Sequence, residues 1–259
     1  GVKKPVALIG IAEKGYMTLE LTVKGEGGHS SMPPKHTTVG ILSKAICAIE
    51  ENPFDADLEG AAADMFRYVG PEMSFPMNMV MANLWLLEPV VEAQMKGAAT
   101  TNASLRTTAA ATMIKGSEKE NVLPQKATAM VNFRIIPGET MDSVTEHVRD
   151  AIDDERVEIR RTENSNGPSG VSDVESKEFT AVRATINTLF PDAIVAPYLV
   201  LETTDSRHYS NLTDKIFRFI PERMKPEDLE RQHGTNERIG IDELADCVRY
   251  YMMLVQSTQ

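Results

Sequence analysis

The sequence predicts an α/β protein with two units, a ferredoxin-like sheet and part of a second sheet that helices cover. The first observation is the order of hydrophobic patterns from residue 16, which runs strand, helix, irregular insertion, strand, strand, helix, strand. That order is typical of the ferredoxin-like split βαβ unit. The second observation is that apolar strands alternate with helical patterns after a loop-type stretch at 164–172, as in an α/β sheet.

The 259-residue chain has the composition of a soluble globular protein, with 42% hydrophobic and 25% charged residues. Its net charge of -11 argues against a nucleic-acid partner or an anionic membrane surface, although a local arginine can still bind a small anion. Cys47 and Cys247 lie in apolar helical patterns, which argues against a disulfide framework or a cysteine metal site. No apolar run approaches the ~18 residues that a membrane span needs. The chain opens with Gly1 rather than Met, so we expect it to begin within a longer protein, and its localisation is not predicted.

The first two predicted strands precede a glycine-rich loop. Residues 5–12 form a continuous apolar run, which predicts a strand covered on both faces. Residues 16–24 alternate between apolar and polar side chains, which predicts a strand with one solvent-facing side. The loop at 25–34 has three glycines and two prolines around His29. Because glycines permit close backbone approach, His29 is a candidate functional residue, although an exposed histidine without a function fits the same pattern.

A helix and an irregular insertion follow this loop. Apolar residues at helical spacing predict a helix from about residue 39 to Glu51. Residues 52–100 are less regular and contain six of the fourteen methionines. These methionines favour a Met-filled core, and the alternative is an adaptable apolar pocket, because thioether side chains repack around varied ligands. Residues 104–113 alternate and predict another strand.

The clearest strand pattern covers residues 127–136 and ends at Pro137. Arg134 lies on its polar face, and Asn121 lies in the loop that leads into the strand. A guanidinium on a rigid sheet can hold a carboxylate through two parallel hydrogen bonds. An amide nearby can donate to the same anion. The alternative is that Arg134 is a solvated strand residue and Asn121 an ordinary turn residue.

The remainder of the chain alternates helices with short strands. We predict helices at 141–152, 179–189 and 241–255, and strands at 157–161, 193–201 and 215–220. Residues 202–209, which include Arg207 and His208, directly follow an apolar strand, where open α/β sheets bind ligands. Residues 232–237 contain His233, whose imidazole could bind a metal ion.

Five motifs, taken together, resemble a known enzyme family. In chain order they are EKGYMTLELTVKGEGGHSSMPP (13–34), FPMNMVMANLWL (75–86), ENVLPQKATAMVNFRIIPG (120–138), TTDSRHY (203–209) and HGTNE (233–237). The family is that of the zinc-dependent aminoacylase and carboxypeptidase metallopeptidases. The similarity is greatest to its branch of Gly-X carboxypeptidases and N-fatty-acyl-amino-acid synthase/hydrolases.

The resemblance implies a dizinc hydrolase that cleaves the amide bond of N-acyl-amino acids or of C-terminal peptide residues. It implies a lid at 15–165, with the insertion at about 52–100, and a partial catalytic domain at 1–14 and 166–259. The lid is expected to join two subunits into a homodimer. The expected partner molecule is a small N-acyl-amino acid or a peptide.

The resemblance also assigns roles by position. His29 matches the lid histidine that polarises the scissile carbonyl, and in dimeric relatives this histidine reaches the active site of the other subunit. Asn121 and Arg134 match the lid pair that binds the substrate carboxylate. Arg207 matches a position near the substrate. His233 matches the most C-terminal zinc ligand.

The chain departs from the family pattern at the metal site. The other zinc ligands and the glutamate general base belong to an N-terminal segment that is not among these 259 residues. We therefore expect two zinc ions in a full-length subunit, but neither bound zinc nor amidase activity in this chain alone. A site built from Asp205, His208 and His233 is the alternative for this chain. The competing function is that of a non-catalytic dimerisation or binding module.

Overall fold

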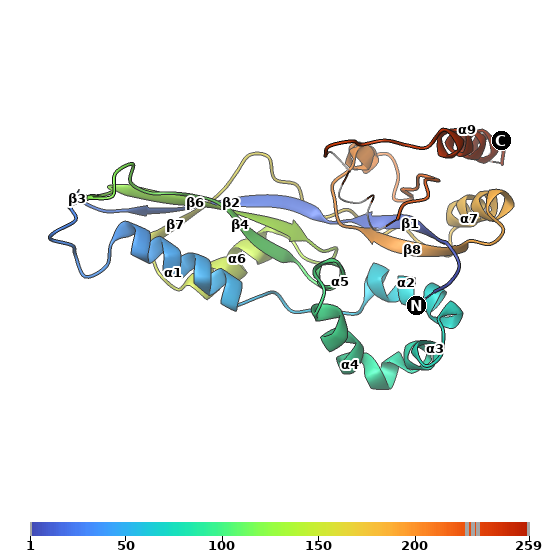
Figure 1. Cartoon of the computed structure of the whole chain (residues 1–259), viewed down its shortest axis with the longest axis horizontal. Helices are drawn as coiled ribbons and strands as arrows, with labels where there is room; N and C mark the ends of the chain where they lie inside the picture. The colour runs from blue at the N-terminus through green and yellow to red at the C-terminus, as the bar shows by residue number, and fades with distance from the viewer. Residues whose placement is uncertain (1, 226–227, 229–230, 232–233, 258–259) are drawn as a thin grey trace.

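The computed structural model describes residues 2–225, 228, 231 and 234–257. The chain forms an elongated molecule with an antiparallel sheet at one end and a parallel pair of strands at the other (Figure 1). The strand β1 (Val6–Glu13) of the parallel pair runs almost directly into β2 (Gly15–Lys24) of the antiparallel sheet, with only Lys14 between them. The two parts are therefore joined by a nearly continuous strand.

The antiparallel sheet has the predicted ferredoxin-like topology, with the strand order β4-β6-β2-β7. Its strands other than β2 are β4 (Thr108–Lys115), β6 (Lys126–Ile135) and β7 (Val157–Arg161). The predicted alternation in β6 is confirmed, because its apolar side chains are buried and its polar side chains, Arg134 among them, are partly exposed. A two-stranded extension of β3 (Gly28–His29) and β5 (Val122–Leu123) forms the tip farthest from β1 (Figure 1).

The helices α1 (Thr38–Glu51) and α6 (Met141–Ile152) pack against this sheet and complete its core. Both begin at a threonine that caps the first turn: Thr37 Oγ1 accepts from the amide of Gly40, and Thr140 forms a capping box with Ser143. These two helices confirm the helical spacing read from the sequence. We call α1, α6 and the four-stranded sheet the ferredoxin-like unit.

The insertion folds into short helices around a small core, and two of its residues, Ala61 and Tyr68, belong to the core at the other end of the molecule. They are α2 (Gly60–Val69), η1 (Gly70–Glu72), α3 (Met77–Ala82), α4 (Leu84–Lys96) and α5 (Ala99–Leu105). Of the methionines in this stretch, Met95 is buried whereas Met79 is exposed, so a Met-filled core describes only part of the insertion. The strand predicted at 104–113 is wrong at its start, because Leu105 packs into this helical core and the strand begins at Thr108.

At the other end, β1 pairs in parallel with β8 (Ile194–Val200). The helix α7 (Lys177–Leu189) and the last helix, α9 (Ile241–Ser257), pack with this pair around a second core. We call these elements the α/β unit. The strand predicted at 215–220 is wrong. Only one antiparallel bridge, between Gly10 and Arg218, forms there, because the Ser172 hydroxyl bonds the backbone N–H and carbonyl of Ile216.

The helix α9 confirms the predicted final helix, but its apolar stripe lies on the surface. The stripe consists of Ile241, Leu244, Val248, Met252 and Val255. All five of its members are more than half exposed to solvent, Met252 for example at 59%, whereas Tyr250 on the same helix is buried. No helix in the described part of the chain is both long and apolar enough to cross a membrane.

Candidate functional site

The two chain segments that connect the units are bound to each other. The amide of Tyr16 donates to the Asn166 carbonyl at 2.8 Å, and the amide of Asn166 donates back at 2.7 Å. Gly15 lies so close to the returning segment that a Cβ atom would be 2.6 Å from the Pro168 nitrogen. A residue with a side chain cannot replace Gly15 without moving this backbone. The junction is therefore compact, and polar side chains from both units meet beside it.

Arg134 reaches from β6 across this junction to the loop that follows β8. Its Nη1 donates to Thr203 Oγ1 at 3.2 Å, and its guanidinium lies 4.9 Å from the centre of the Tyr16 ring. Within the described part of the chain, no carboxylate pairs with Arg134. A guanidinium without an anionic partner retains donors for a carboxylate.

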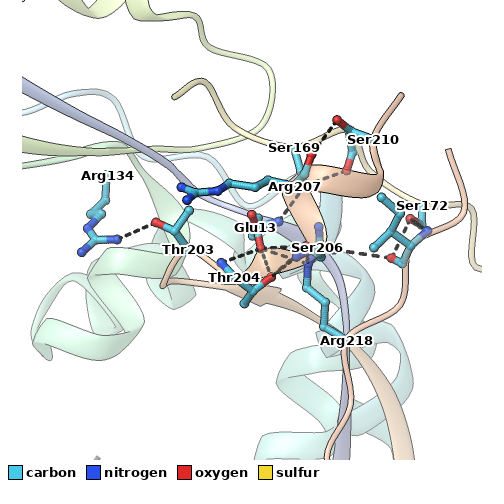
Figure 2. A network of polar contacts seen from close by, with 12 residues as sticks. Glu13, Arg134, Ser169, Ser172, Thr203, Thr204, Ser206, Arg207, Ser210 and Arg218 are labelled. Carbon is cyan, nitrogen blue, oxygen red and sulfur yellow. Dashed lines mark hydrogen bonds and ion pairs between the residues drawn. The ribbon is translucent and has the colours of Figure 1, made fainter. Parts of the chain in front are cut away.

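The same loop carries Arg207 on η2 (Asp205–Tyr209), a short helix whose first turn is capped by Thr204. In Figure 2 the Arg207 side chain extends past Thr203 towards the side on which Arg134 lies. Its Nε lies 3.5 Å from Nε2 of His208, and no described carboxylate forms an ion pair with it. Two arginines without acidic partners among the described residues therefore border Thr203, at the carboxyl end of β8, although the whole chain carries a net charge of -11.

A buried glutamate holds this loop in place. Glu13, the last residue of β1, is 2% exposed. Its Oε2 accepts hydrogen bonds from the amide and hydroxyl of Thr204, at 3.2 and 2.6 Å, from Ser206 Oγ at 3.1 Å and from Arg218 Nε at 3.1 Å (Figure 2). No pattern in the sequence indicated this network. The available signal was an acidic residue, Glu13, that closes an otherwise apolar strand.

Lys14 adds a third basic group at the junction. It is 1% exposed, and its Nζ donates to the carbonyls of Ala103 and Arg106 at 2.8 Å each. Burial, and after it the positive charge of Arg134, lower the pKa of Lys14 to about 7, whereas the nearby Glu139 acts in the opposite direction. Lys14 therefore joins the end of α5 to the junction and is sensitive to the charge around Arg134.

His29 and Asn121 lie together at the tip of the ferredoxin-like unit. His29 pairs with Val122 in the β3–β5 ladder, and the Ser30 amide donates to the Asn121 carbonyl at 3.1 Å. The Ser31 amide donates to His29 Nδ1 at 3.2 Å. Because a backbone N–H can only donate, Nδ1 is the accepting nitrogen, and the neutral ring carries its proton on Nε2.

The strand β6 separates these two groups within one chain. It runs from the tip to the junction, and the eight residue steps from Lys126 to Arg134 correspond to roughly 27 Å at ~3.4 Å per residue. The structure thus brings His29 together with Asn121, and Arg134 together with the loop of Arg207. It does not bring Asn121 and Arg134 together within one subunit.

The described residues do not by themselves fit a zinc site. Zinc in proteins takes three or four ligands from His, Cys, Asp and Glu side chains. Among the residues that the structure describes, no group of three such side chains could hold a metal ion. His233, the ligand that the family resemblance implies, lies outside the described residues.

Solved structures of known proteins share this fold. An M20 family metallo-carboxypeptidase, Sso-CP2 from Sulfolobus solfataricus, aligns with a TM-score of 0.64 and 16% identity, over 97% of this chain and 60% of that one. The dipeptidase Dug1p from Saccharomyces cerevisiae aligns with a TM-score of 0.59 and 13% identity, over 99% of this chain and 56% of that one. Identities this low show the fold alone, and they confirm the predicted fold class.

Sequence relatives are more similar. The chain is 39% identical to "Probable carboxypeptidase S-like 2" of Dictyostelium discoideum and 42% identical to "N-fatty-acyl-amino acid synthase/hydrolase PM20D1" of Xenopus tropicalis. Both matches cover 100% of this chain but only 50% and 51% of the relative, so the chain spans about half the length of the curated relatives it matches. Residues 11–160 match the family model described as "Peptidase dimerisation domain". This match confirms the resemblance read from the motifs, and the chain belongs to the M20 peptidase dimerisation domain family.

Proposed function

We propose that this chain is the lid and part of the catalytic domain of a metal-dependent hydrolase that cleaves the amide bond of N-acyl-amino acids or of C-terminal peptide residues. The observation that carries the proposal is the arrangement of Arg134 and Arg207 around Thr203, without acidic partners in the described chain. The printed names of the relatives, carboxypeptidases and N-fatty-acyl-amino acid synthase/hydrolases, support the reaction class.

In this proposal the junction binds the substrate carboxylate. Arg134 donates two hydrogen bonds to it, Thr203 orients the guanidinium, and Arg207 adds a second positive charge. A carboxylate held at a fixed point positions the neighbouring amide bond for attack. This lowers the activation free energy of hydrolysis, because the substrate loses its orientational freedom on binding rather than in the transition state. The proposal follows from the polar face of β6, which directs Arg134 towards a loop at the carboxyl end of a parallel strand.

His29 and Asn121 enter the proposal as residues that a second subunit supplies. The strand β6, which measures roughly 27 Å from Lys126 to Arg134, separates them from Arg134, and this is too far for one small substrate to contact both groups. In a homodimer joined through the lid, the tip of one subunit would lie over the junction of the other. There the Nε2–H of His29 would donate to the amide carbonyl, whose oxygen gains negative charge during attack.

The proposal places residues 15–165 in the lid and residues 1–14 and 166–259 in the catalytic domain. The exposed apolar stripe of α9 supports this division, because a helix face of this kind is normally covered by other parts of a domain. We assign His233 to the metal site on the family resemblance, with zinc as the metal. Bound zinc would supply an activated water for hydrolysis.

A binding experiment tests the proposal with the chain itself. N-acetyl-leucine and its amide, N-acetyl-leucinamide, differ only in the carboxylate, and isothermal titration measures the dissociation constant of each. We expect the carboxylate probe to bind more tightly, and Arg134→Ala to weaken its binding by roughly 2–4 kcal/mol, about 30-fold or more. Arg149→Ala, which removes an exposed arginine of α6, is the matched control. Equal affinity of the wild-type chain for the two probes would exclude the carboxylate site.

The second candidate function is a dimerisation module without catalysis. The observation that favours it is the outer strand β4, which pairs only with β6 in the described sheet and exposes 67% of Met113 and 60% of Ile114. An edge strand with exposed apolar side chains can pair with a second copy. A chain that dimerises but does not distinguish the two probes would favour this function.

A further inference from the structure

We propose that Glu13 is a positioning residue that fixes the loop 203–209 so that Arg134 and Arg207 face one carboxylate. The inference rests on the proposed function, and it concerns a residue with no role in the motif-based assignments. Glu13 is not placed in contact with the substrate. It acts on the two arginines through Thr203 and Thr204.

The Glu13 carboxylate is buried. Removing a charged group from water is costly unless hydrogen bonds and an opposite charge compensate it. Glu13 has both. Its Oε2 accepts hydrogen bonds from Thr204 and Ser206, and it also accepts one from Nε of the positively charged Arg218. Four hydrogen bonds to one buried oxygen hold these residues in one arrangement, although Arg218 Nη2 is buried without a partner among the described residues.

The position of Thr204 links this network to the two arginines. Both its amide and its hydroxyl donate to Glu13, so its backbone and its side chain are fixed. The preceding residue, Thr203, accepts the hydrogen bond of Arg134. The hydroxyl of Thr204 also accepts from the Ser206 amide and so caps the short helix that carries Arg207. Thr204 thus couples the position of Glu13 to the positions of both arginines.

The charge of the network also matters. A lone carboxylate near Arg134 and Arg207 would compete with the substrate carboxylate for their donors. Arg218 pairs with Glu13 at 3.1 Å, so the network brings no net negative charge to the junction. The loop can therefore be held by an acid while the two neighbouring arginines remain available to an anion.

Thr204 provides the sharpest test, because it can be changed without disrupting the buried Glu13–Arg218 pair. Thr204→Val removes the hydroxyl but keeps the branched shape, and Thr204→Ser keeps the hydroxyl. Thr188→Val, on an exposed face of α7 where the hydroxyl bonds the Ala184 carbonyl, is the matched control. The readouts are the ratio of affinities for N-acetyl-leucine and N-acetyl-leucinamide, and amide hydrogen exchange in residues 203–209.

We expect Thr204→Val to lower the affinity ratio by about tenfold, the usual effect of one hydrogen bond to a charged group, and to speed exchange in 203–209. Thr204→Ser and Thr188→Val should leave both readouts within about twofold of wild type. A general loss of stability would weaken both probes equally and leave the ratio unchanged, and that outcome would overturn the inference. If the wild-type chain shows no preference for the carboxylate, the proposed function fails before any Thr204 variant is compared, so the two failures are distinguishable.

Discussion

Replacement of Lys14 by methionine should remove a pH dependence from the stability of this protein. Burial lowers the pKa of Lys14 from 10.5 in the unfolded chain to about 7 in the folded chain. Between these two pH values the unfolded chain binds the proton and the folded chain does not. Raising the pH through this window therefore increases the free energy of unfolding.

The magnitude follows from the width of that window. The interval from 7 to 10.5 is 3.5 pH units, which at about 1.36 kcal/mol per unit gives roughly 5 kcal/mol as an upper bound. The neutral amine keeps two N–H donors, and two carbonyls, those of Ala103 and Arg106, accept them. The folded state can thus release the proton at neutral pH without losing either hydrogen bond.

Urea unfolding between pH 6.5 and 9.5 measures this effect. We expect the unfolding free energy of the wild-type chain to rise by about 2–3 kcal/mol more over this range than that of Lys14→Met. The variant should also lose about 1–3 kcal/mol at every pH, because two buried carbonyls lose their donor. Lys44→Met, which removes an exposed lysine of α1, is the control and should follow the wild-type pH curve. The same slope in Lys14→Met and wild type would refute the assignment of this titration to Lys14.

Three further predictions concern the site and the surfaces. Arg134→Lys should recover only part of the carboxylate affinity that Arg134→Ala loses, because an ammonium cannot form the two parallel hydrogen bonds of a guanidinium. Isothermal titration with N-acetyl-leucine measures this affinity, and full recovery would contradict bidentate binding of the carboxylate. Ile114→Lys should raise the dissociation constant of a homodimer formed through β4 by about tenfold, because a charged side chain blocks pairing of an edge strand. Analytical ultracentrifugation measures this constant, and an unchanged value would place the interface elsewhere. Replacing Val248 and Met252 together by serine should reduce binding of the dye ANS with little loss of stability, since both side chains are exposed, and a large drop in melting temperature would mean that the stripe is already packed.

The sequence predicted the ferredoxin-like unit well because its patterns have a local cause. In β6 the buried and exposed side chains alternate along the whole strand, so burial on one face determines the pattern residue by residue. The same reasoning failed at 104–113 and at 215–220. In the first stretch Leu105 packs into the helical insertion, and in the second Ser172 takes the hydrogen bonds of Ile216. Both errors come from contacts with residues outside the stretch itself, which the pattern of that stretch does not contain.

The candidate site likewise combines a residue whose position a local pattern predicts with contacts that no local pattern predicts. Periodicity placed Arg134 on the polar face of its strand, and the structure agrees, but no pattern indicated that Thr203 would bond to it. Glu13 is the clearer case. Its partners Thr204, Ser206 and Arg218 lie about 190 to 205 positions further along the chain, and they meet because β1 and β8 are parallel neighbours whose carboxyl ends lie at the same edge. A residue's role in such a network depends on strand adjacency, which single-sequence patterns do not contain.

The length of β6 also bears on how two subunits would share the proposed site. A rigid strand of this length places its two ends too far apart to serve one small molecule, so His29 and Arg134 can act on the same substrate only across a subunit boundary. In that arrangement the surface that joins two subunits would also set the distance between Arg134 of one subunit and His29 of the other. Substitutions on the outer strand β4 would then change catalysis without touching a substrate-binding residue. Dimer affinity and substrate affinity should therefore fall together in Ile114→Lys when a probe long enough to reach both groups is used, whereas binding of N-acetyl-leucine to the junction alone should remain.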